Sequence, residues 1–158
     1  MIKKFLSLFA VLLLVSACES TPSDDSMAGM NGAGMGAATP GSARDFAENV
    51  GDRVFFPTDS SSLTSEGRMT LDKQVAWLKK YGSTKVAVEG HADERGTREY
   101  NLALGERRAT AAKNYLIGAG IPAARISTIS YGKERPAVTG TGEAAWSQNR
   151  RAVTVVTQ

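Results

Sequence analysis

The chain is poor in residues that form disulfides and metal sites, with one cysteine and one histidine among its 158 residues. Cys18 has no second thiol to pair with, which excludes an intramolecular disulfide. Cys18 and His91 alone cannot assemble a metal site from cysteine and histidine ligands. We therefore predict no metal and no other cofactor.

Long apolar runs are missing as well. An almost wholly apolar stretch, residues 5–15, follows Lys3 and Lys4. As a helix this stretch rises about 16 Å, roughly half the hydrocarbon thickness of a bilayer, which argues against a permanent transmembrane span. A basic start, a short apolar stretch and small residues after it are instead the layout of a secretory signal peptide. We assign it to residues 1–17 and expect an exported chain.

The chain also lacks a strong charge of one sign. Its formal net charge of +3 comes from 19 basic and 16 acidic residues. Removal of Lys3 and Lys4 with the signal peptide leaves 17 basic residues against 16 acidic ones. The composition therefore gives no argument for nucleic-acid binding. With 42% hydrophobic and 22% charged residues, the chain suits one globular domain plus extended ends.

Cys18 directly follows Val-Ser-Ala at residues 15–17, and this stretch resembles the bacterial lipoprotein processing box. In such a box the thiol receives a diacylglycerol, and cleavage then makes the cysteine the first residue, whose amine is acylated. Several acyl chains, at roughly 0.8 kcal/mol per buried methylene, hold a protein on a membrane more firmly than one chain. We interpret Cys18 as the lipidation site; the alternative is an incidental cysteine beside an ordinary cleavage site.

Residues 18–44 consist of this cysteine and a stretch rich in glycine, alanine and methionine. Small flexible residues bury too little surface to offset their ordering entropy, so we expect a linker. As a random coil it spans roughly 28 Å on average. Met27, Met30 and Met35 recur at uneven spacing; we interpret them as filler, and the alternative is a methionine metal cluster.

Residues 45–158 alternate between strand and helix patterns, which predicts helices packed on one sheet. The expected fold is a two-layer α/β sandwich with a mixed sheet in the order βαβαβ(α)β, while the strand order and the direction of the last strand stay open. Strands are expected over residues 53–56, 85–89, 125–131 and 151–157, and helices over residues 64–81, 97–116 and 143–148. The buried stripe of the second helix is expected to contain Leu102, Gly105, Ala109, Ala112 and Leu116.

Polar residues flank that stripe on one edge of the second helix. Asn101 and Arg108 lie seven residues apart, or 700° at 100° per residue, so they share an edge, whereas Arg107 is rotated 100° toward solvent. A guanidinium at position 108 suits a carboxylate, and Asp93 in the preceding loop suits an ammonium group. The alternative is an ordinary solvated face formed by residues 106–108.

Four sequence motifs make the chain similar to a known family. They are residues 88–97, 99–109, 131–138 and 148–153, which read VEGHADERGT, EYNLALGERRA, YGKERPAV and QNRRAV. The chain resembles the peptidoglycan-associated lipoproteins of the OmpA-like domain family over about residues 50–158. The resemblance implies noncovalent binding of the meso-diaminopimelate residue of the peptidoglycan stem peptide. One position departs from the family: Pro57 stands where many relatives have an acidic residue, and proline has no N–H to donate.

The resemblance also implies which residues form the ligand pocket. The family's pocket aspartate, arginine and asparagine fall on Asp93, Arg108 and Asn101. A free end of diaminopimelate carries an ammonium and a carboxylate on one carbon, so an acid and a base together select it. The loop after the first strand and the pocket rim add Phe56, Thr58, Asp59 and Arg150.

Partners and location follow from the same resemblance. It implies binding to TolB and other proteins of the Tol-Pal system, which acts in cell division and envelope integrity, and an anchor in outer-membrane lipid at the periplasmic face. Glu19 occupies the position where an aspartate favours inner-membrane retention. Two other classes remain as alternatives: an enzyme using His91, Asp93 and a serine among residues 60–62, and a module that binds only proteins.

Overall fold

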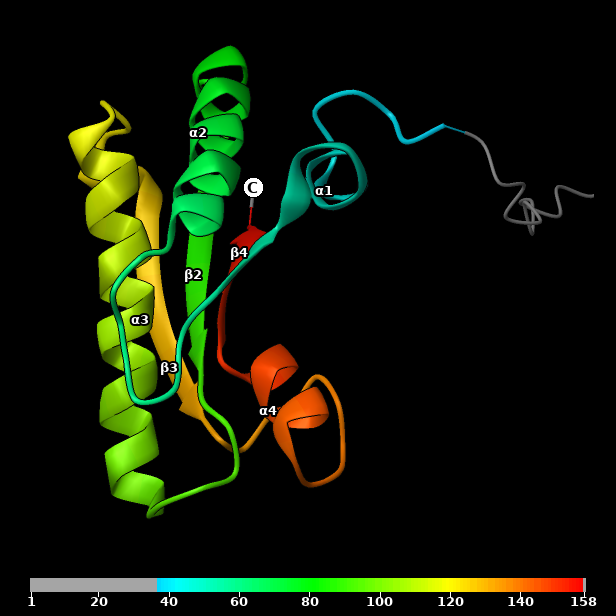
Figure 1. Ribbon diagram of the computed structural model, residues 1–158. Coiled ribbons are helices and arrows are strands. Elements are labelled where there is room, and N and C mark those ends of the chain that lie inside the picture. Colours follow the sequence, from blue (N-terminus) through cyan, green and yellow to red (C-terminus); the bar gives the residue numbers. More distant parts are fainter. Residues whose placement is uncertain (1–36, 158) are drawn as a thin grey trace, which may run out of the picture. The chain divides into compact units, whose positions relative to one another are not determined.

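The computed structural model describes residues 37–157. The predicted signal peptide, Cys18, Glu19 and residues 18–36 of the predicted linker lie outside the described residues. The folded unit begins with a short helical turn and continues with alternating strands and helices (Figure 1). The elements are α1 (Ala43–Asp45), η1 (Phe46–Gly51), β1 (Arg53–Phe55), α2 (Ser65–Lys80), β2 (Val86–His91), α3 (Arg98–Gly118), η2 (Ala123–Arg125), β3 (Ile126–Gly132), α4 (Glu143–Asn149) and β4 (Arg151–Val156).

The four strands form one mixed sheet in the order β1-β4-β2-β3. Strand β4 runs antiparallel to both of its neighbours, with Ala152 opposite Val54 and Thr154 opposite Val88. Strands β2 and β3, which α3 connects, are parallel neighbours, whereas β1 and β2, which α2 connects, are separated by β4. The direction of the last strand, open from the sequence, is thus antiparallel.

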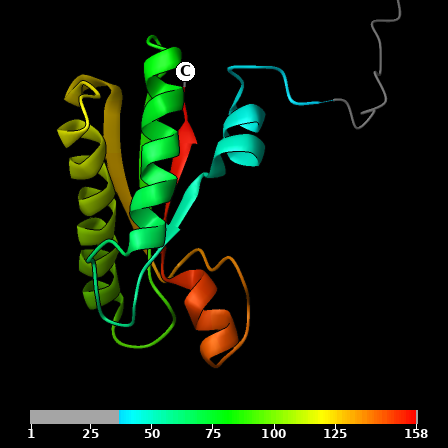
Figure 2. The ribbon, with the colours of Figure 1, turned by 45° about the horizontal axis from the view of Figure 1, so that its top comes forward.

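Helices α2 and α3 cover one face of the sheet, and α4 lies at the end of the sheet where β2 and β3 finish (Figures 1 and 2). The predicted two-layer α/β sandwich with a mixed sheet is therefore confirmed. Between the two layers lies an apolar core that both helices and all four strands supply. Its members include Val54, Leu71, Leu78, Val88, Ala109, Leu116, Ile126 and Ala152.

A threonine caps each long helix at the first residue of its predicted range. The Thr64 hydroxyl accepts a hydrogen bond from the Gly67 N–H at 3.0 Å, and the Thr97 hydroxyl accepts one from the Tyr100 N–H at 3.2 Å. The predicted buried stripe of α3 is correct from Gly105 onward. Its first member is wrong: Leu104 is buried and Leu102 only half-buried, because Leu104 lies on the side of α3 from which Arg108 bonds to the loop between β1 and α2.

A close contact between two glycines sets the spacing of α3 over β2. A Cβ on Gly105 would lie 2.8 Å from the Gly90 carbonyl oxygen and 2.3 Å from the Ser130 hydroxyl. The helix main chain thus rests directly on the strand, which brings the residues that follow Gly105 close to the end of β2.

No helix among residues 37–157 is long and apolar enough to cross a membrane.

A candidate ligand pocket beside Asp93

A pocket of about 280 Å³ lies where two loops meet the first two turns of α3. The loop between β1 and α2 forms one wall, and the loop between β2 and α3 forms the other. The volume is near the lower end of the range for small-molecule sites. The lining residues are Thr58, Asp59, Asp93, Arg95, Gly96, Tyr100, Asn101 and Leu104.

The wall from the β1–α2 loop is tied to α3 and to Arg150, which directly precedes β4. The Tyr100 hydroxyl of α3 donates a hydrogen bond to the Asp59 carboxylate. Asp59 has a φ of 53°, a left-handed conformation that aspartate tolerates better than most residues. The Phe56 N–H donates to the Arg150 carbonyl oxygen at 2.9 Å, so the loop leaves β1 in a defined direction.

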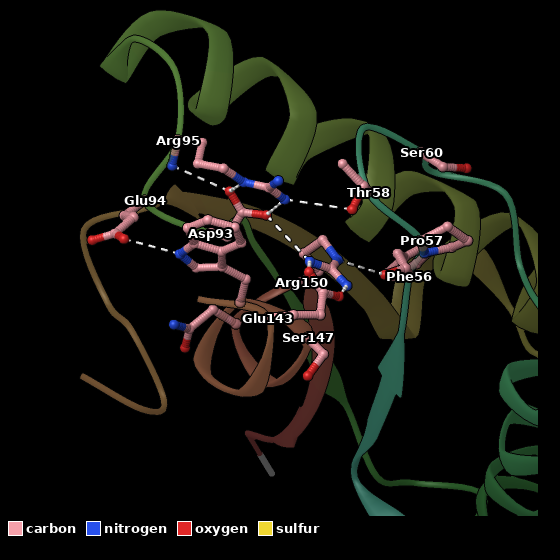
Figure 3. Close-up of polar contacts among 12 residues, drawn as sticks. Phe56, Pro57, Thr58, Ser60, Asp93, Glu94, Arg95, Glu143, Ser147 and Arg150 are labelled. Carbon is pink, nitrogen blue, oxygen red and sulfur yellow. Dashed lines mark hydrogen bonds and ion pairs between the residues drawn. The ribbon is translucent and has the colours of Figure 1, made fainter. Parts of the chain in front are cut away.

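The Asp93 carboxylate lies between two guanidinium groups (Figure 3). Its Oδ1 accepts hydrogen bonds from the Arg95 N–H at 3.1 Å and from Arg95 Nε at 3.0 Å, and its Oδ2 accepts one from Arg95 Nη2 at 2.6 Å. Arg150 Nη1 lies 3.5 Å from the same Oδ2. Burial acts to raise the pKa of Asp93, but the bonds from Arg95 and Arg150 hold it below its ordinary value. Asp93 is therefore a buried, ionised carboxylate.

Arg108 is fully buried and donates to three main-chain carbonyl groups. Its Nε bonds to Ser60 O at 2.9 Å, its Nη1 to His91 O at 2.8 Å and its Nη2 to Pro57 O at 3.1 Å. Burial lowers the pKa of Arg108 to about 10, and the side chain keeps its charge at neutral pH. Since a guanidinium has five N–H groups, roughly two remain after these three bonds. Arg108 thus places a buried cation behind the pocket wall.

Asn101 and Arg150 each hold one of the two pocket loops in place through hydrogen bonds. The Asn101 amide donates to Arg95 O at 2.8 Å and to Thr97 O at 3.0 Å, which holds the loop that precedes α3. Arg150, also buried, donates from Nε to Phe56 O at 3.1 Å and pairs with the Glu143 carboxylate of α4 (Figure 3).

The structure brings all seven predicted ligand-binding residues into one region, in two layers. Thr58, Asp59, Asp93 and Asn101 line the pocket, and Phe56, Arg108 and Arg150 lie behind its lining. A solvated face is correct for Glu106 and Arg107, which are exposed, and wrong for Arg108. Ligand binding by the seven predicted residues stays a prediction.

Sequence reasoning missed four lining residues: Arg95, Gly96, Tyr100 and Leu104. The signal was present for two of them. Arg95 follows Asp93 by two residues in the same loop, and Leu104 follows Asn101 by three residues on the same side of the helix. Tyr100 could not be identified from the sequence because its pocket contact depends on Asp59, 41 residues earlier.

His91 has the surroundings of a structural residue. It is buried, and its ring lies 5.6 Å from the Tyr131 ring. Burial, together with the charges of Arg151 and Arg135, lowers its pKa to about 4, so the imidazole is neutral at neutral pH. Within residues 37–157 no three histidine, cysteine, aspartate or glutamate side chains group to hold a metal.

Comparisons with known proteins show the family to which the chain is similar. Residues 55–150 match the OmpA family. The chain is 54% identical over 147 residues to the peptidoglycan-associated lipoprotein of Mesorhizobium japonicum, covering 92% of this chain and 86% of that protein. It is 45% identical over 157 residues to the protein of the same name from Pseudomonas aeruginosa, covering 94% and 93%.

Two solved structures share the fold. The crystal structure of the peptidoglycan-associated lipoprotein from Burkholderia pseudomallei has 40% sequence identity and a TM-score of 0.65, covering 66% of this chain and 89% of that one. The C-terminal domain of Helicobacter pylori MotB has a TM-score of 0.63 at 18% identity, covering 68% of this chain and 84% of that one. At that identity the likeness concerns the fold alone.

Proposed function

This chain belongs to the peptidoglycan-associated lipoproteins of the OmpA family, and from that premise we propose that it is a lipid-anchored protein whose folded domain binds peptidoglycan noncovalently. The proposed ligand is the free end of meso-diaminopimelate in the stem peptide. The domain would then connect the cell wall to the membrane that holds the lipid.

The observation that supports this function best is the ionised carboxylate of Asp93 at the pocket wall. A buried carboxylate accepts an ammonium group in a charge-assisted hydrogen bond, which is stronger than a neutral one. The cation of Arg108, behind the same pocket, favours a carboxylate beside that ammonium. A zwitterion on one carbon therefore fits the pocket better than a simple cation or anion does.

The same pocket favours binding over catalysis. A nucleophilic serine needs a base within hydrogen-bond reach, and the only histidine is buried against Tyr131. Ser60 follows the pocket-lining residue Asp59 in the sequence and contributes its carbonyl oxygen to Arg108. We infer that the domain holds its ligand without transforming it.

We further propose that acyl chains on Cys18 anchor the protein to the periplasmic face of the outer membrane. Glutamate at position 19 is a weaker version of the aspartate signal that favours inner-membrane retention. Membership in the family also supports TolB and other Tol-Pal proteins as partners in cell division and envelope integrity. The linker of residues 18–44 would allow the domain to reach the wall from the membrane.

A competition pull-down tests the function. The full-length protein is incubated with purified peptidoglycan, alone and with excess free meso-diaminopimelate or, as the matched control, excess Nα-acetyl-L-lysine, which has an ammonium group but no carboxylate on the same carbon. We expect the protein to sediment with peptidoglycan, diaminopimelate to release it and Nα-acetyl-L-lysine to leave it bound. Sedimentation that neither compound affects would place the interaction outside this pocket. Failure to sediment would favour a module that binds only proteins.

A further inference from the structure

We propose that Arg95 determines which stem peptide the pocket accepts, by exchanging its ion-pair partner when the ligand binds. In the free protein its guanidinium pairs with Asp93. In the complex the ligand ammonium takes that place on Asp93, and Arg95 turns to the ligand carboxylate. This inference rests on the proposed function, since it concerns the same pocket.

In the free protein, Arg95 already occupies the carboxylate that a ligand ammonium needs. Both oxygens of Asp93 accept bonds from the Arg95 side chain, Oδ1 at 3.0 Å and Oδ2 at 2.6 Å (Figure 3). Arg150 lies on the far side of Oδ2, at 3.5 Å. A carboxylate between two guanidinium groups has little room for a third cation, so one of the two must move.

Of the two guanidinium groups, that of Arg95 is the more exposed and has the weaker further bonds. The Arg150 side chain is 6% exposed and is held by the Phe56 carbonyl oxygen and the Glu143 carboxylate. The Arg95 side chain is 39% exposed and lines the pocket, and its one further side-chain bond is a long one, 3.4 Å, to the Thr58 hydroxyl. Arg95 therefore leaves Asp93 more readily than Arg150 does, because its own charge is already exposed to solvent.

The surroundings of Arg95 allow its side chain to move while its main chain stays in place. The guanidinium of Arg95 lies over the Trp146 ring, 4.1 Å from its centroid, and Trp146 itself is held by a 2.9 Å bond to Glu94. The Asn101 amide holds the Arg95 carbonyl oxygen, so the main chain stays in place. The guanidinium can slide across the aromatic face and still keep its cation–π contact.

Partner exchange explains how the pocket separates two stem peptides. Diaminopimelate brings an ammonium and a carboxylate, so Asp93 and Arg95 each lose one partner and gain another. A lysine side chain brings only the ammonium, so Asp93 gains a partner while Arg95 loses its own. The lysine peptide must therefore displace a bidentate ion pair without replacing it.

Isothermal titration of the full-length protein in detergent with two probes tests the exchange. The probes are the tripeptides L-Ala-γ-D-Glu-meso-diaminopimelate and L-Ala-γ-D-Glu-L-Lys. We compare the unmodified chain with Arg95→Ala and with the control Arg98→Ala, which removes an exposed arginine whose partner is Glu134. In Arg95→Ala we expect tighter binding of the lysine tripeptide. The Kd of the lysine tripeptide divided by the Kd of the diaminopimelate tripeptide should fall by about tenfold or more. Arg98→Ala should keep the original ratio.

The outcomes separate this inference from the proposed function. If the unmodified protein binds the diaminopimelate tripeptide and Arg95→Ala keeps the original ratio, the exchange is wrong and the proposed function stands. If the unmodified protein binds neither tripeptide, both are wrong. A second readout needs no variant: the NMR signal of Arg95 Nε–H should shift with the diaminopimelate tripeptide. An Nε–H signal that stays in place at saturation would also overturn the exchange.

Discussion

The main chains of Gly90 in β2 and Gly105 in α3 lie in direct contact: a Cβ on Gly90 would come within 1.8 Å of the Gly105 carbonyl oxygen. That contact sets the height of the helix above the sheet, three residues before Arg108 reaches the His91 carbonyl oxygen. A methyl group here would have to push two main chains apart, since no flexible side chain is available to give way.

We therefore predict that Gly90→Ala lowers the free energy of unfolding by about 3 kcal/mol or more, the upper range for overpacking. Urea denaturation measures this directly. Gly118→Ala is the control, because nothing lies within 4 Å of a Cβ at that position; it should change stability by less than about 1 kcal/mol. Equal effects of the two substitutions would show that the glycine contact does not set the spacing.

The second prediction concerns the two charged residues of the pocket. Asp93→Ala and Arg108→Ala should each weaken peptidoglycan binding by roughly 2 to 5 kcal/mol, since removal of one charge strands others in a buried site. Arg108→Ala should also lower the melting temperature, because the carbonyl groups of Pro57, Ser60 and His91 lose their donor. Binding is therefore measured well below that temperature, on the folded protein.

Arg107→Ala is the matched control for Arg108→Ala. Arg107 is exposed and does not line the pocket, although its guanidinium lies 5.9 Å from the Tyr100 ring centroid. Its removal should change binding by less than about 0.5 kcal/mol, the usual scale for a surface substitution. If Arg107→Ala were as damaging as Arg108→Ala, the site would have to be redrawn around Arg107.

The third prediction is that the stability of the folded protein depends on pH through His91. Burial lowers its pKa to about 4 in the folded protein, against the ordinary 6.5. The unfolded chain therefore binds a proton at a higher pH, and stability falls as the pH drops from 6.5 toward 4. At about 1.4 kcal/mol per pKa unit, the contribution is about 3 kcal/mol.

His91→Phe should remove this part of the pH dependence, because phenylalanine stacks on Tyr131 without titrating. Urea midpoints at several pH values measure the difference between the two proteins. Because the chain has one histidine, its NMR signal also reports the pKa without ambiguity. A folded-state pKa of 6 or above would contradict the buried, neutral imidazole.

The fourth prediction concerns the anchor. Cys18→Ala should give a folded protein that no longer sediments with membranes, while its binding to purified peptidoglycan survives. Loss of both properties together would show that anchor and pocket are not separate modules. Fractionation of the unmodified protein tests the location, and recovery mainly with inner-membrane markers would contradict an outer-membrane anchor.

Much of the fold could be predicted from local patterns. Thr64 and Thr97 marked two helix starts because a hydroxyl before a helix satisfies a free N–H, and this chemistry depends only on neighbours in the chain. The helical turn of residues 43–51 was not foreseen. It is stabilised by a distant residue, since the Trp77 indole donates to the Asp45 carboxylate at 2.8 Å and packs on Phe46.

Which residues form the site could be predicted from the sequence, but which of them line the pocket and which lie behind it could not. Helical spacing placed Asn101 and Arg108 on one edge, and the structure agrees that both are buried. Spacing alone could not show that Arg108 would donate to carbonyl groups of a loop about fifty residues earlier. Arg95 was missed although it follows Asp93 by two residues, because its contact with Trp146 appears only in space.

The most direct test of the central claim is an NMR titration of the isotope-labelled mature chain with the diaminopimelate tripeptide. We predict that the largest amide shifts occur at residues 58–59, 93–96 and 100–101, and that Asp93→Asn abolishes them. A smaller pocket of about 190 Å³ shares Glu94 with this region, and three of its other residues, Lys133, Val138 and Asn149, serve as the internal control and should shift little. Shifts centred on that second pocket, or shifts that persist in Asp93→Asn, would contradict the account.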